Sequence, residues 1–319
     1  MKRLSILDPS IVSYNLGNEI IFESISEIVS TELDHYFSTR LQFTDKLGRI
    51  SKKYVRESDL VLLAGTNSLS SKMSKLEQFK INLFDTLYLN NITLCGVGWW
   101  QYQEKPTPFS KFVIKRMLSD AFIHSVRDSY TEQALHSIGI TNVLNTSCPS
   151  LWKISDDHCH DIPVGKSRSV LFTLTDYNKN PVDDRNILNL LADCYENIYF
   201  WPQGIGDTAY LNSINLKNDI KITYLSPNLK SLDSFLASNT TDYIGTRLHS
   251  GIRAIQHKKR ALIIAIDNRA KEISKDTNIN STLRNDIERI NNFINNEYST
   301  RIVLPWKNIE KWKNQFKAC

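Results

Sequence analysis

Short apolar or β-branched runs alternate with longer stretches of helical period along the chain, and this alternation occurs twice. In the first half the pattern predicts strands at 4–7, 36–43, 60–63, 92–96, 121–125 and 142–144. Helices are predicted between them at 18–29, 109–117 and 130–138. Such alternation favours a parallel sheet covered by helices on both faces.

A polar segment broken by Pro163 and Gly165 separates the first series from a second one. The second series predicts strands at 170–174, 198–201, 220–225, 242–245 and 261–266, and helices at 184–192, 232–237, 250–257, 283–295 and 306–316. We therefore expect an α/β protein with two Rossmann-like domains that face each other across a cleft. The predicted division is an N-terminal domain at 1–152, a linker at 153–168, a C-terminal domain at 169–305 and a terminal helix at 306–319.

The composition is that of an ordinary globular protein, with 319 residues, 41% hydrophobic and 23% charged. Its 39 Lys and Arg exceed its 34 Asp and Glu only slightly, and the two signs are interleaved. This balance favours an anionic substrate or surface and argues against a nucleic-acid partner. The longest apolar runs, at 60–64 and 261–266, are far shorter than the roughly 20 residues that cross a bilayer. With no secretory signal in view, we expect a cytoplasmic protein.

The clearest chemical signal follows the predicted strand that ends at Gly245. An extended continuation through Thr246 would place Arg247 and His249 on one side of the chain. Ser250 is predicted to cap the next helix, whose first N–H groups form an anion site. Together these groups predict a site that binds a phosphate or a carboxylate. The alternative is a surface arginine and a histidine that is satisfied in the core.

A second cluster, Asp267, Asn268 and Arg269, follows the next buried strand and would lie beside the first if the two strands are neighbours. A solvated helix face is the alternative for this cluster.

Two pieces of the first half have a similar layout. Arg127 follows a strand, where Asp128 could hold it in place and Ser129 is predicted to cap the next helix. Near the N-terminus, Gly17 would let backbone N–H groups approach a ligand. Loop and cap structure without a ligand is the alternative for both.

Together these pieces resemble polysaccharide pyruvyl transferases. Similarity to the family's motifs extends over residues 11–272, in the same order and with similar spacing. The motifs are Asn15-Leu16-Gly17-Asn18-Glu19, Leu62-Leu63-Ala64-Gly65-Thr66-Asn67-Ser68, Ser125-Val126-Arg127-Asp128-Ser129-Tyr130 with Gly139-Ile140, Cys148-Pro149-Ser150-Leu151, Gly245-Thr246-Arg247-Leu248-His249 and Asp267-Asn268-Arg269. The sequence departs from the family at Asn18, where Asp is usual, and at Ala64 and Thr66 in the Gly-rich turn.

The resemblance implies a fold of the glycosyltransferase B type and transfer of pyruvate from phosphoenolpyruvate to a sugar, as a ketal across two hydroxyls, in surface polysaccharide biosynthesis. Phosphoenolpyruvate is then a co-substrate, no other cofactor is expected, and the sugar acceptor could be lipid-linked. Because guanidinium groups bind carboxylate and phosphate in bidentate geometry, arginines are the natural donor ligands. The expected donor-binding residues are Arg127, Thr246, Arg247, Ser250, Asn268 and Arg269, and those of loops near the ligand are Asn15, Gly17, Asn18, Gly65 and Asn67. We assign proton transfer to His249, assisted by Arg247.

Other interpretations stay open or are disfavoured. A glycosyltransferase that uses a nucleotide sugar and a catalytically silent carbohydrate-binding scaffold are the alternatives to a pyruvyl transferase. The Gly-x-Gly-x-x-Ala pattern at 204–209 is a weak dinucleotide signal without a correctly spaced acidic partner. The polar run at 156–161 has zinc-ligand types but no second ligand cluster, so no metal is expected.

The last predicted helix carries an aromatic and apolar stripe at Trp306, Ile309, Trp312 and Phe316, with lysines around it. Packing against the rest of the protein is favoured, and contact with an anionic membrane at the inner face of the cell is the alternative. The oligomeric state is left open by the sequence.

Overall fold

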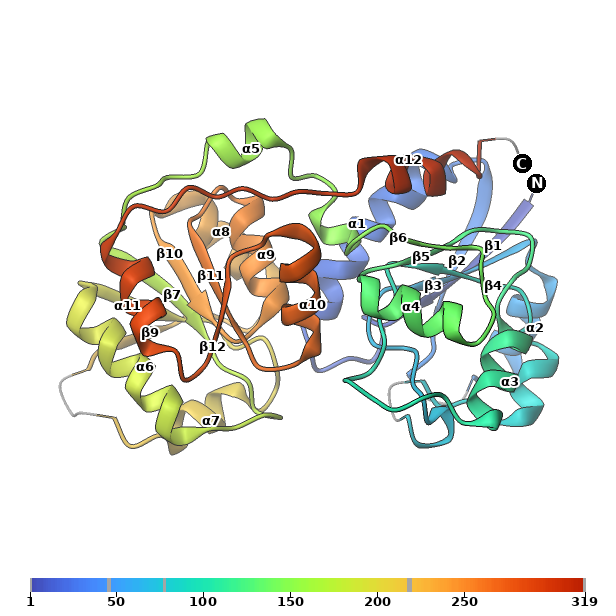
Figure 1. Cartoon of the computed structure of the whole chain (residues 1–319), viewed down its shortest axis with the longest axis horizontal. Helices are drawn as coiled ribbons and strands as arrows, with labels where there is room; N and C mark the ends of the chain where they lie inside the picture. Colours follow the sequence, from blue (N-terminus) through green and yellow to red (C-terminus); the bar gives the residue numbers. More distant parts are fainter. Residues whose placement is uncertain (1, 45–46, 77–78, 217–219, 318–319) are drawn as a thin grey trace. The chain divides into compact units, whose positions relative to one another are not determined.

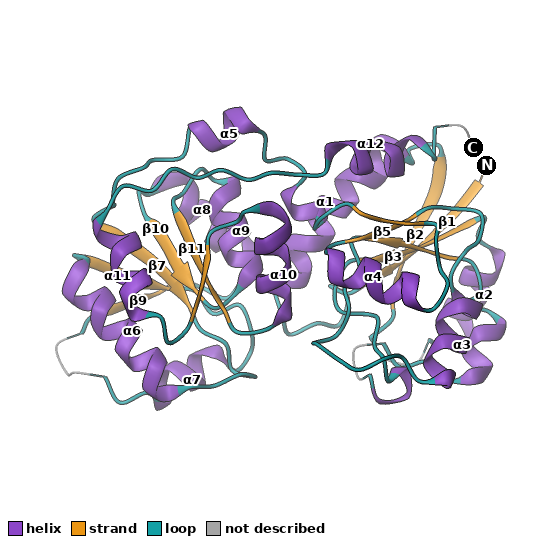
Figure 2. Ribbon diagram, in the orientation of Figure 1, coloured by secondary structure: helices purple, strands orange, loops and turns teal. Residues whose placement is uncertain are grey.

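The structure is a computed structural model that describes residues 2–44, 47–76, 79–216 and 220–317. The chain forms two compact units. The first comprises Met1–Ser13, Ile21–Trp152 and Leu304–Cys319, and the second comprises Tyr14–Ile20 and Lys153–Val303. Both are α/β units built on parallel sheets, as Figures 1 and 2 show.

The first unit contains a parallel sheet in the order β2-β1-β3-β4. Beyond β4, a parallel bridge between Val97 and Val126 connects to the β5-β6 pair. The strands are β1 (Lys2–Asp8), β2 (Tyr36–Gln42), β3 (Leu60–Ala64), β4 (Ile92–Cys95), β5 (His124–Val126) and β6 (Val143–Asn145). The helices are α1 (Gly17–Glu32), which begins in the second unit, α2 (Arg49–Glu57), α3 (Pro108–Met117), α4 (Ser129–Ser137) and α12 (Trp306–Asn314), with short 3-10 turns η1 (Met73–Lys75), η2 (Leu83–Leu87) and η3 (Pro149–Leu151).

The alternating pattern of the strands explains how this sheet is covered. Leu63 and Leu94 share one core with Ile114 of α3 and Leu135 of α4. Because successive side chains of a strand point to opposite faces, Leu62 belongs to the other face. Buried apolar contact of this kind contributes about 25 cal/mol for each Å² removed from water.

The terminal helix α12 packs within the first unit. Ile309, Trp312 and Phe316 are buried, and Trp312 meets the ring of Trp152 with centroids 5.7 Å apart. Phe316 stacks on Phe122 at 5.8 Å. The structure thus gives the aromatic stripe the packing role that the sequence favours, with Trp306 left partly exposed.

Within the described ranges, no helix combines the length and apolar character that crossing a bilayer requires.

His124, on β5, gives the first unit a pH-dependent stability. Its Nδ1 accepts a hydrogen bond from the Leu94 amide at 3.3 Å, and burial lowers the pKa of His124 from 6.5 to about 4. Below pH 6.5 the unfolded chain therefore takes up a proton that the folded chain refuses, so stability present above pH 6.5 is lost as the pH falls towards 4.

We expect the unfolding free energy to fall by about 2 kcal/mol through His124 when the pH is lowered from 7.5 to 5. His124→Asn keeps an acceptor for Leu94 but does not titrate in this range, so urea unfolding at the two pH values should show a smaller acid loss for the variant. Equal losses in both proteins would contradict the assignment.

The second unit contains a parallel sheet in the order β12-β11-β10-β7-β8-β9. The strands are β7 (Ser169–Thr173), β8 (Asn197–Phe200), β9 (Ile222–Tyr224), β10 (Asp242–Gly245), β11 (Ala261–Ala265) and β12 (Ser281–Leu283). This is the doubly wound Rossmann order, in which the direction of chain progress reverses between β7 and β10. Ligands of such sheets bind beyond the carboxyl ends of the strands at that reversal.

Helices cover both faces of the second sheet (Figure 1). They are α6 (Pro181–Cys194), α7 (Asp207–Ser213), α8 (Leu229–Ser238), α9 (Leu248–Gln256), α10 (Asn268–Thr277) and α11 (Ile287–Asn295), whereas the short α5 (Asp156–His160) lies off the sheet. Phe172 and Ile264 face a core shared with α6, α7 and α11. On the other face, Gly251 of α9 packs on Tyr243 and Ile263.

Several details differ from the predicted elements and boundaries. The expected linker contains α5 and belongs to the second unit, where His158 Nε2 lies 2.7 Å from the Ile255 carbonyl. The predicted helix at 283–295 begins only at Ile287, because β12 occupies 281–283 as an edge strand beside β11. The terminal helix, together with residues 304–305, groups with the first unit, and residues 14–20 group with the second.

Candidate functional site

A pocket lies within the second unit at the carboxyl ends of its strands. It draws on the loops after β7, β8, β10 and β11, which surround the reversal point of the sheet. Residue 15, from the short segment that joins this unit, completes it. The lining residues are Asn15, Tyr177, Gln203, Thr246, Arg247, Leu248, His249, Ile266, Asp267, Arg269 and Ala270.

The end of β10 and the start of α9 place the first predicted cluster. Gly245 ends the strand, and Arg247 is the N-cap residue of α9, with extended backbone angles. The first helical hydrogen bond runs from the Gly251 amide to the Arg247 carbonyl at 3.2 Å. This N-terminus has no side-chain cap, so the positive end of the helix dipole lies at the pocket.

Two expectations about this segment are wrong. Ser250 does not cap α9, and His249 does not continue an extended strand, because the helix already begins at Leu248. The buried Leu248 fixes this early start, and the Tyr243 hydroxyl donates a 2.7 Å hydrogen bond to the Arg247 carbonyl. Arg247 and His249 still both line the pocket, from the N-cap and the first turn.

Arg247 is held by two carboxylates that do not line the pocket. Its Nε donates to Asp207 at 3.0 Å and its Nη2 donates to the same carboxylate, which forms a bidentate pair. Nη2 also donates to Asp176 at 3.0 Å, and Nε to the Leu174 carbonyl at 3.1 Å. Nη1 makes no hydrogen bond with any described residue. The guanidinium is therefore fixed in direction while one nitrogen keeps its donors for a ligand.

Asp207 is the carboxylate on which this arrangement depends. It is fully buried at the start of α7 and accepts the amides of Gln203 at 3.1 Å and Gly204 at 2.7 Å. Burial raises the pKa of Asp207, while the adjacent Arg247 guanidinium opposes that shift. We expect the ionised form to hold, because a bidentate guanidinium and three amide donors, the third being the Asp176 amide at 3.2 Å, all favour the carboxylate.

The ion pair between Arg247 and Asp207 requires a glycine at position 204. A Cβ at this position would lie 2.3 Å from Nη2 of Arg247, so any side chain would displace the guanidinium. The Gly-x-Gly-x-x-Ala pattern thus serves a buried ion pair. Asp207 lies inside this pattern, so the pattern is the sequence signal for it, although as a motif it indicates only a weak dinucleotide site.

A second guanidinium lies in the same pocket. Arg269, in the first turn of α10, donates from Nε to Asp267 at 2.9 Å and from Nη2 to the Tyr177 hydroxyl. Asp267 also caps α10 by accepting the Arg269 amide at 3.0 Å. The Tyr177 ring centroid lies 5.2 Å from Cζ of Arg247 and 5.9 Å from Cζ of Arg269. Tyr177 and Asp176, from the loop after β7, were not predicted as site residues.

A hydrogen-bonded chain joins the N-terminal loop to α9. Ser250 Oγ donates to Gln203 Oε1 at 2.7 Å, and Gln203 Nε2 donates to Asn15 Oδ1 at 2.8 Å. The same Asn15 oxygen accepts the Gly17 amide at 3.1 Å, and the Asn18 amide donates to the Asn15 carbonyl at 3.0 Å. Ser250, Gly17 and Asn18 thus support pocket residues without lining the pocket themselves.

The remaining predicted residues, Gly65, Asn67 and Arg127, belong to the first unit. Arg127 is 1% exposed and donates from Nη2 to Asn67 Oδ1 and from Nε to Asp128 Oδ2 at 3.2 Å. Gly65, at the end of β3, has a positive φ of 56°, and a Cβ there would lie 2.4 Å from Ile21. The expectation that Ser129 caps α4 is wrong, because Asp128 is the cap and accepts the Thr131 amide at 2.7 Å.

The second unit therefore brings together Asn15, Thr246, Arg247, His249 and Arg269. Asn268 is buried in the first turn of α10 and is not a lining residue. Asp176, Asp207 and Asp267 balance the charge of the two guanidinium groups, so the pocket has little net positive charge. An anion would be bound mainly by the N–H donors that these pairs leave unused and by the N-terminus of α9. Among the described residues, no group of three or more His, Cys, Asp or Glu is placed to bind a metal ion.

Solved structures define the class of fold. The chain is similar to UDP-GlcNAc 2-epimerase from Methanocaldococcus jannaschii, solved with UDP-GlcNAc and UDP, with TM-score 0.59, 11% identity and coverage of 100% of this chain and 99% of that one. It is also similar to S. aureus MnaA solved with UDP, with TM-score 0.56, 13% identity and coverage of 94% and 93%. At this identity the likeness concerns the fold alone. It confirms a two-domain α/β protein with a fold of the glycosyltransferase B type.

The family follows from the sequence itself. The family model described as polysaccharide pyruvyl transferase matches residues 15–268, and the chain belongs to that family. It is therefore a transferase. No curated protein matches the chain.

Proposed function

We propose that the protein transfers pyruvate from phosphoenolpyruvate to two hydroxyls of a sugar during surface polysaccharide biosynthesis. The convergence of Arg247, His249 and Arg269 at the uncapped N-terminus of α9 is the main support. A small molecule with a carboxylate and a phosphate suits these groups, because guanidinium and helix N–H donors both prefer anionic oxygens.

In this proposal Arg247 binds the donor through Nη1, while Asp207 and Asp176 fix its direction. Asn15 and Gln203 border the same space, and the 2.8 Å hydrogen bond from Gln203 Nε2 to Asn15 Oδ1 holds both side-chain amides in place. Because these hydrogen-bonding side chains are already held in place, less conformational entropy is lost when the ligand binds.

His249 has the proton-transfer role. Ketal formation requires a proton at the methylene carbon of phosphoenolpyruvate, loss of the protons of two sugar hydroxyls, formation of two C–O bonds at the central carbon and departure of phosphate. An imidazole can both donate and accept protons near neutral pH. His249 is the only histidine among the pocket-lining residues of the described chain.

A second candidate is a glycosyltransferase that uses a nucleotide sugar. The observation in its favour is that two similar solved structures hold UDP or UDP-GlcNAc. In that case Arg247 and Arg269 would bind the diphosphate. Family membership favours the pyruvyl donor.

Ligand-induced stabilisation distinguishes the two donors. We expect phosphoenolpyruvate at 100 times its Kd to stabilise the protein by about 2.7 kcal/mol, a shift in Tm of several degrees, because it binds the folded state only. UDP-GlcNAc should give no shift. The measurement is thermal unfolding with each ligand, with inorganic phosphate as the control for simple anion binding.

Mass spectrometry then tests the reaction. Sugar acceptors incubated with enzyme and phosphoenolpyruvate should gain the mass of pyruvate less one water, with release of one phosphate. A Tm response to UDP-GlcNAc alone would favour the second candidate. No response to either donor would favour a carbohydrate-binding scaffold.

A further inference from the structure

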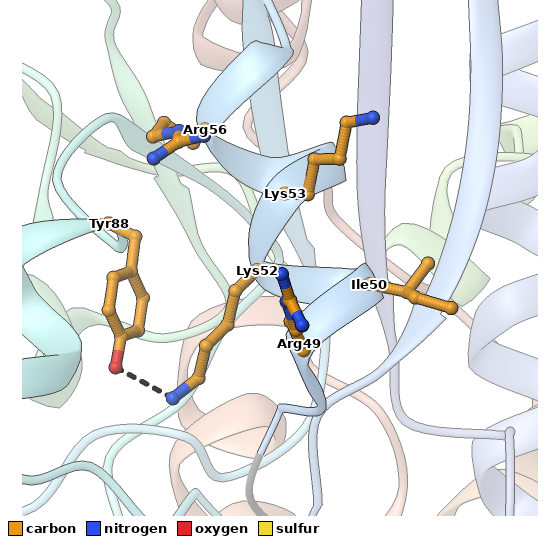
Figure 3. Close-up of a pocket in the computed structure, with 6 residues that line it drawn as sticks. All are labelled: Arg49, Ile50, Lys52, Lys53, Arg56 and Tyr88. Atoms are coloured by element: carbon orange, nitrogen blue, oxygen red, sulfur yellow. Dashed lines mark hydrogen bonds between the residues drawn. The ribbon is translucent and has the colours of Figure 1, made fainter.

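Helix α2 of the first unit carries a basic surface that the transferase site does not use. Four of its nine residues are cationic, namely Arg49, Lys52, Lys53 and Arg56. Together with Ile50 and Tyr88 they line an open hollow of about 970 Å³, which Figure 3 shows with Lys52 donating to the Tyr88 hydroxyl at 2.7 Å. We call these four cations with Ile50 and Tyr54 the α2 surface.

The charges of the α2 surface are arranged against the stability of the helix. Arg49 lies three and four positions before Lys52 and Lys53, and Arg56 lies four and three positions after them, so each cation has two neighbours of like charge on the helix surface. Arg49 is also in the first turn, where the helix dipole disfavours a cation, and the helix has no side-chain cap. Such an arrangement is relieved when an anionic partner is bound.

Internal carboxylates neutralise little of this charge. Lys52 lies 3.6 Å from Asp85, and the helix's own Glu57 pairs with Arg3 at 3.4 Å. Arg49, Lys53 and Arg56 are exposed and form no ion pair with a described residue. Three guanidinium or ammonium groups therefore face solvent within two helical turns.

Apolar side chains are exposed beside these cations. Ile50 is 72% exposed and Tyr54 is 45% exposed, four residues apart on the same helix. Phe37 of β2 is 64% exposed and lines a neighbouring hollow with Lys53 and Tyr54. Val55 is the only buried residue of α2, so most of the helix is available to a partner.

We infer that the α2 surface docks the protein on a bilayer that contains anionic phospholipid. Phosphate groups complement the four cations, and the exposed Ile50, Tyr54 and Phe37 insert among the lipid chains at the interface. A purely hydrophilic polyanion would satisfy the cations but would leave these apolar side chains in water. This site lies outside α12, whose Trp312 is buried and whose Trp306 is exposed.

Vesicle cosedimentation of the full chain tests the inference. Binding is expected to vesicles in which about a third of the lipid is phosphatidylglycerol and not to pure phosphatidylcholine. Lys53→Ala with Arg56→Ala should weaken binding about 25-fold, since each cation contributes about fivefold. Ile50→Ser should weaken it about tenfold through lost apolar insertion.

The matched control removes two exposed lysines of the second unit, Lys221→Ala with Lys230→Ala, which gives the same net charge. This control should bind vesicles like the parent. Absence of binding to anionic vesicles, or an equal loss in the control, would overturn the inference. So would full binding by Ile50→Ser together with complete competition by soluble dextran sulfate, because that result would identify a site for soluble polyanions.

Discussion

Arg247→Ala is expected to weaken phosphoenolpyruvate binding and to lower kcat/KM for the donor about 10²- to 10³-fold. The reason is the loss of an aligned, charge-assisted donor at the pocket, the guanidinium that Asp207 and Asp176 hold in place. The unfolding free energy should also fall, by about 3–5 kcal/mol, because Asp207 would keep a buried charge without its partner. Donor titration and urea unfolding measure the two effects separately.

Two further variants separate the effect of Arg247 on donor binding from its effect on stability. Arg260→Ala removes an equally buried arginine that lies 3.5 Å from Asp242 and is not a pocket-lining residue, so it should destabilise the protein and leave the donor Kd unchanged. Arg247→Ala with Asp207→Asn should recover part of the stability but none of the binding. A parental donor Kd in that double variant would exclude Arg247 as a donor ligand.

His249→Gln is expected to lower kcat about 10²- to 10⁴-fold with little change in donor Kd, because general acid and base catalysis contributes in this range. Its place in the first turn of α9, with Arg247 at the N-cap, puts the imidazole beside the proposed donor site. Single-turnover kinetics with phosphoenolpyruvate measure the chemical step, and equilibrium titration measures binding.

The matched control is His257→Gln, at the other end of the same helix. His257 lies 3.3 Å from Asp233 and is not a pocket-lining residue, so this variant should keep the parental kcat. Parental turnover in purified His249→Gln would remove His249 from the proton-transfer steps and direct attention to another acid or base.

Much of the second unit could be predicted because its strands are continuous apolar runs with polar residues directly behind them. β10 and β11 are buried along their whole length, and each is followed by the arginine that enters the pocket. Since parallel strands end at one edge, placing Arg247 near Arg269 needed only the assumption that these strands are neighbours, which the structure confirms.

The features of the site that the sequence does not predict depend on contacts between residues that are distant along the chain. Asp207 is 40 positions from Arg247, and only the order of strands brings the loop after β8 beneath the guanidinium. The helix start at Leu248 is another case. Ser250 has the better capping side chain, but packing of Leu248 and the bond from Tyr243 to the Arg247 carbonyl determine where the turn closes.

The path of the chain has a practical consequence for dissecting this protein. Its division falls after residues 13, 20, 152 and 303, so neither unit is one continuous stretch. A fragment cut after Trp152 would lack Trp312 and Phe316 and would expose the rings that they cover. A fragment begun at Lys153 would lack Asn15, the hydrogen-bonding partner of Gln203. Isolated halves would therefore report on damaged cores and an incomplete pocket, whereas point substitutions in the intact chain keep both.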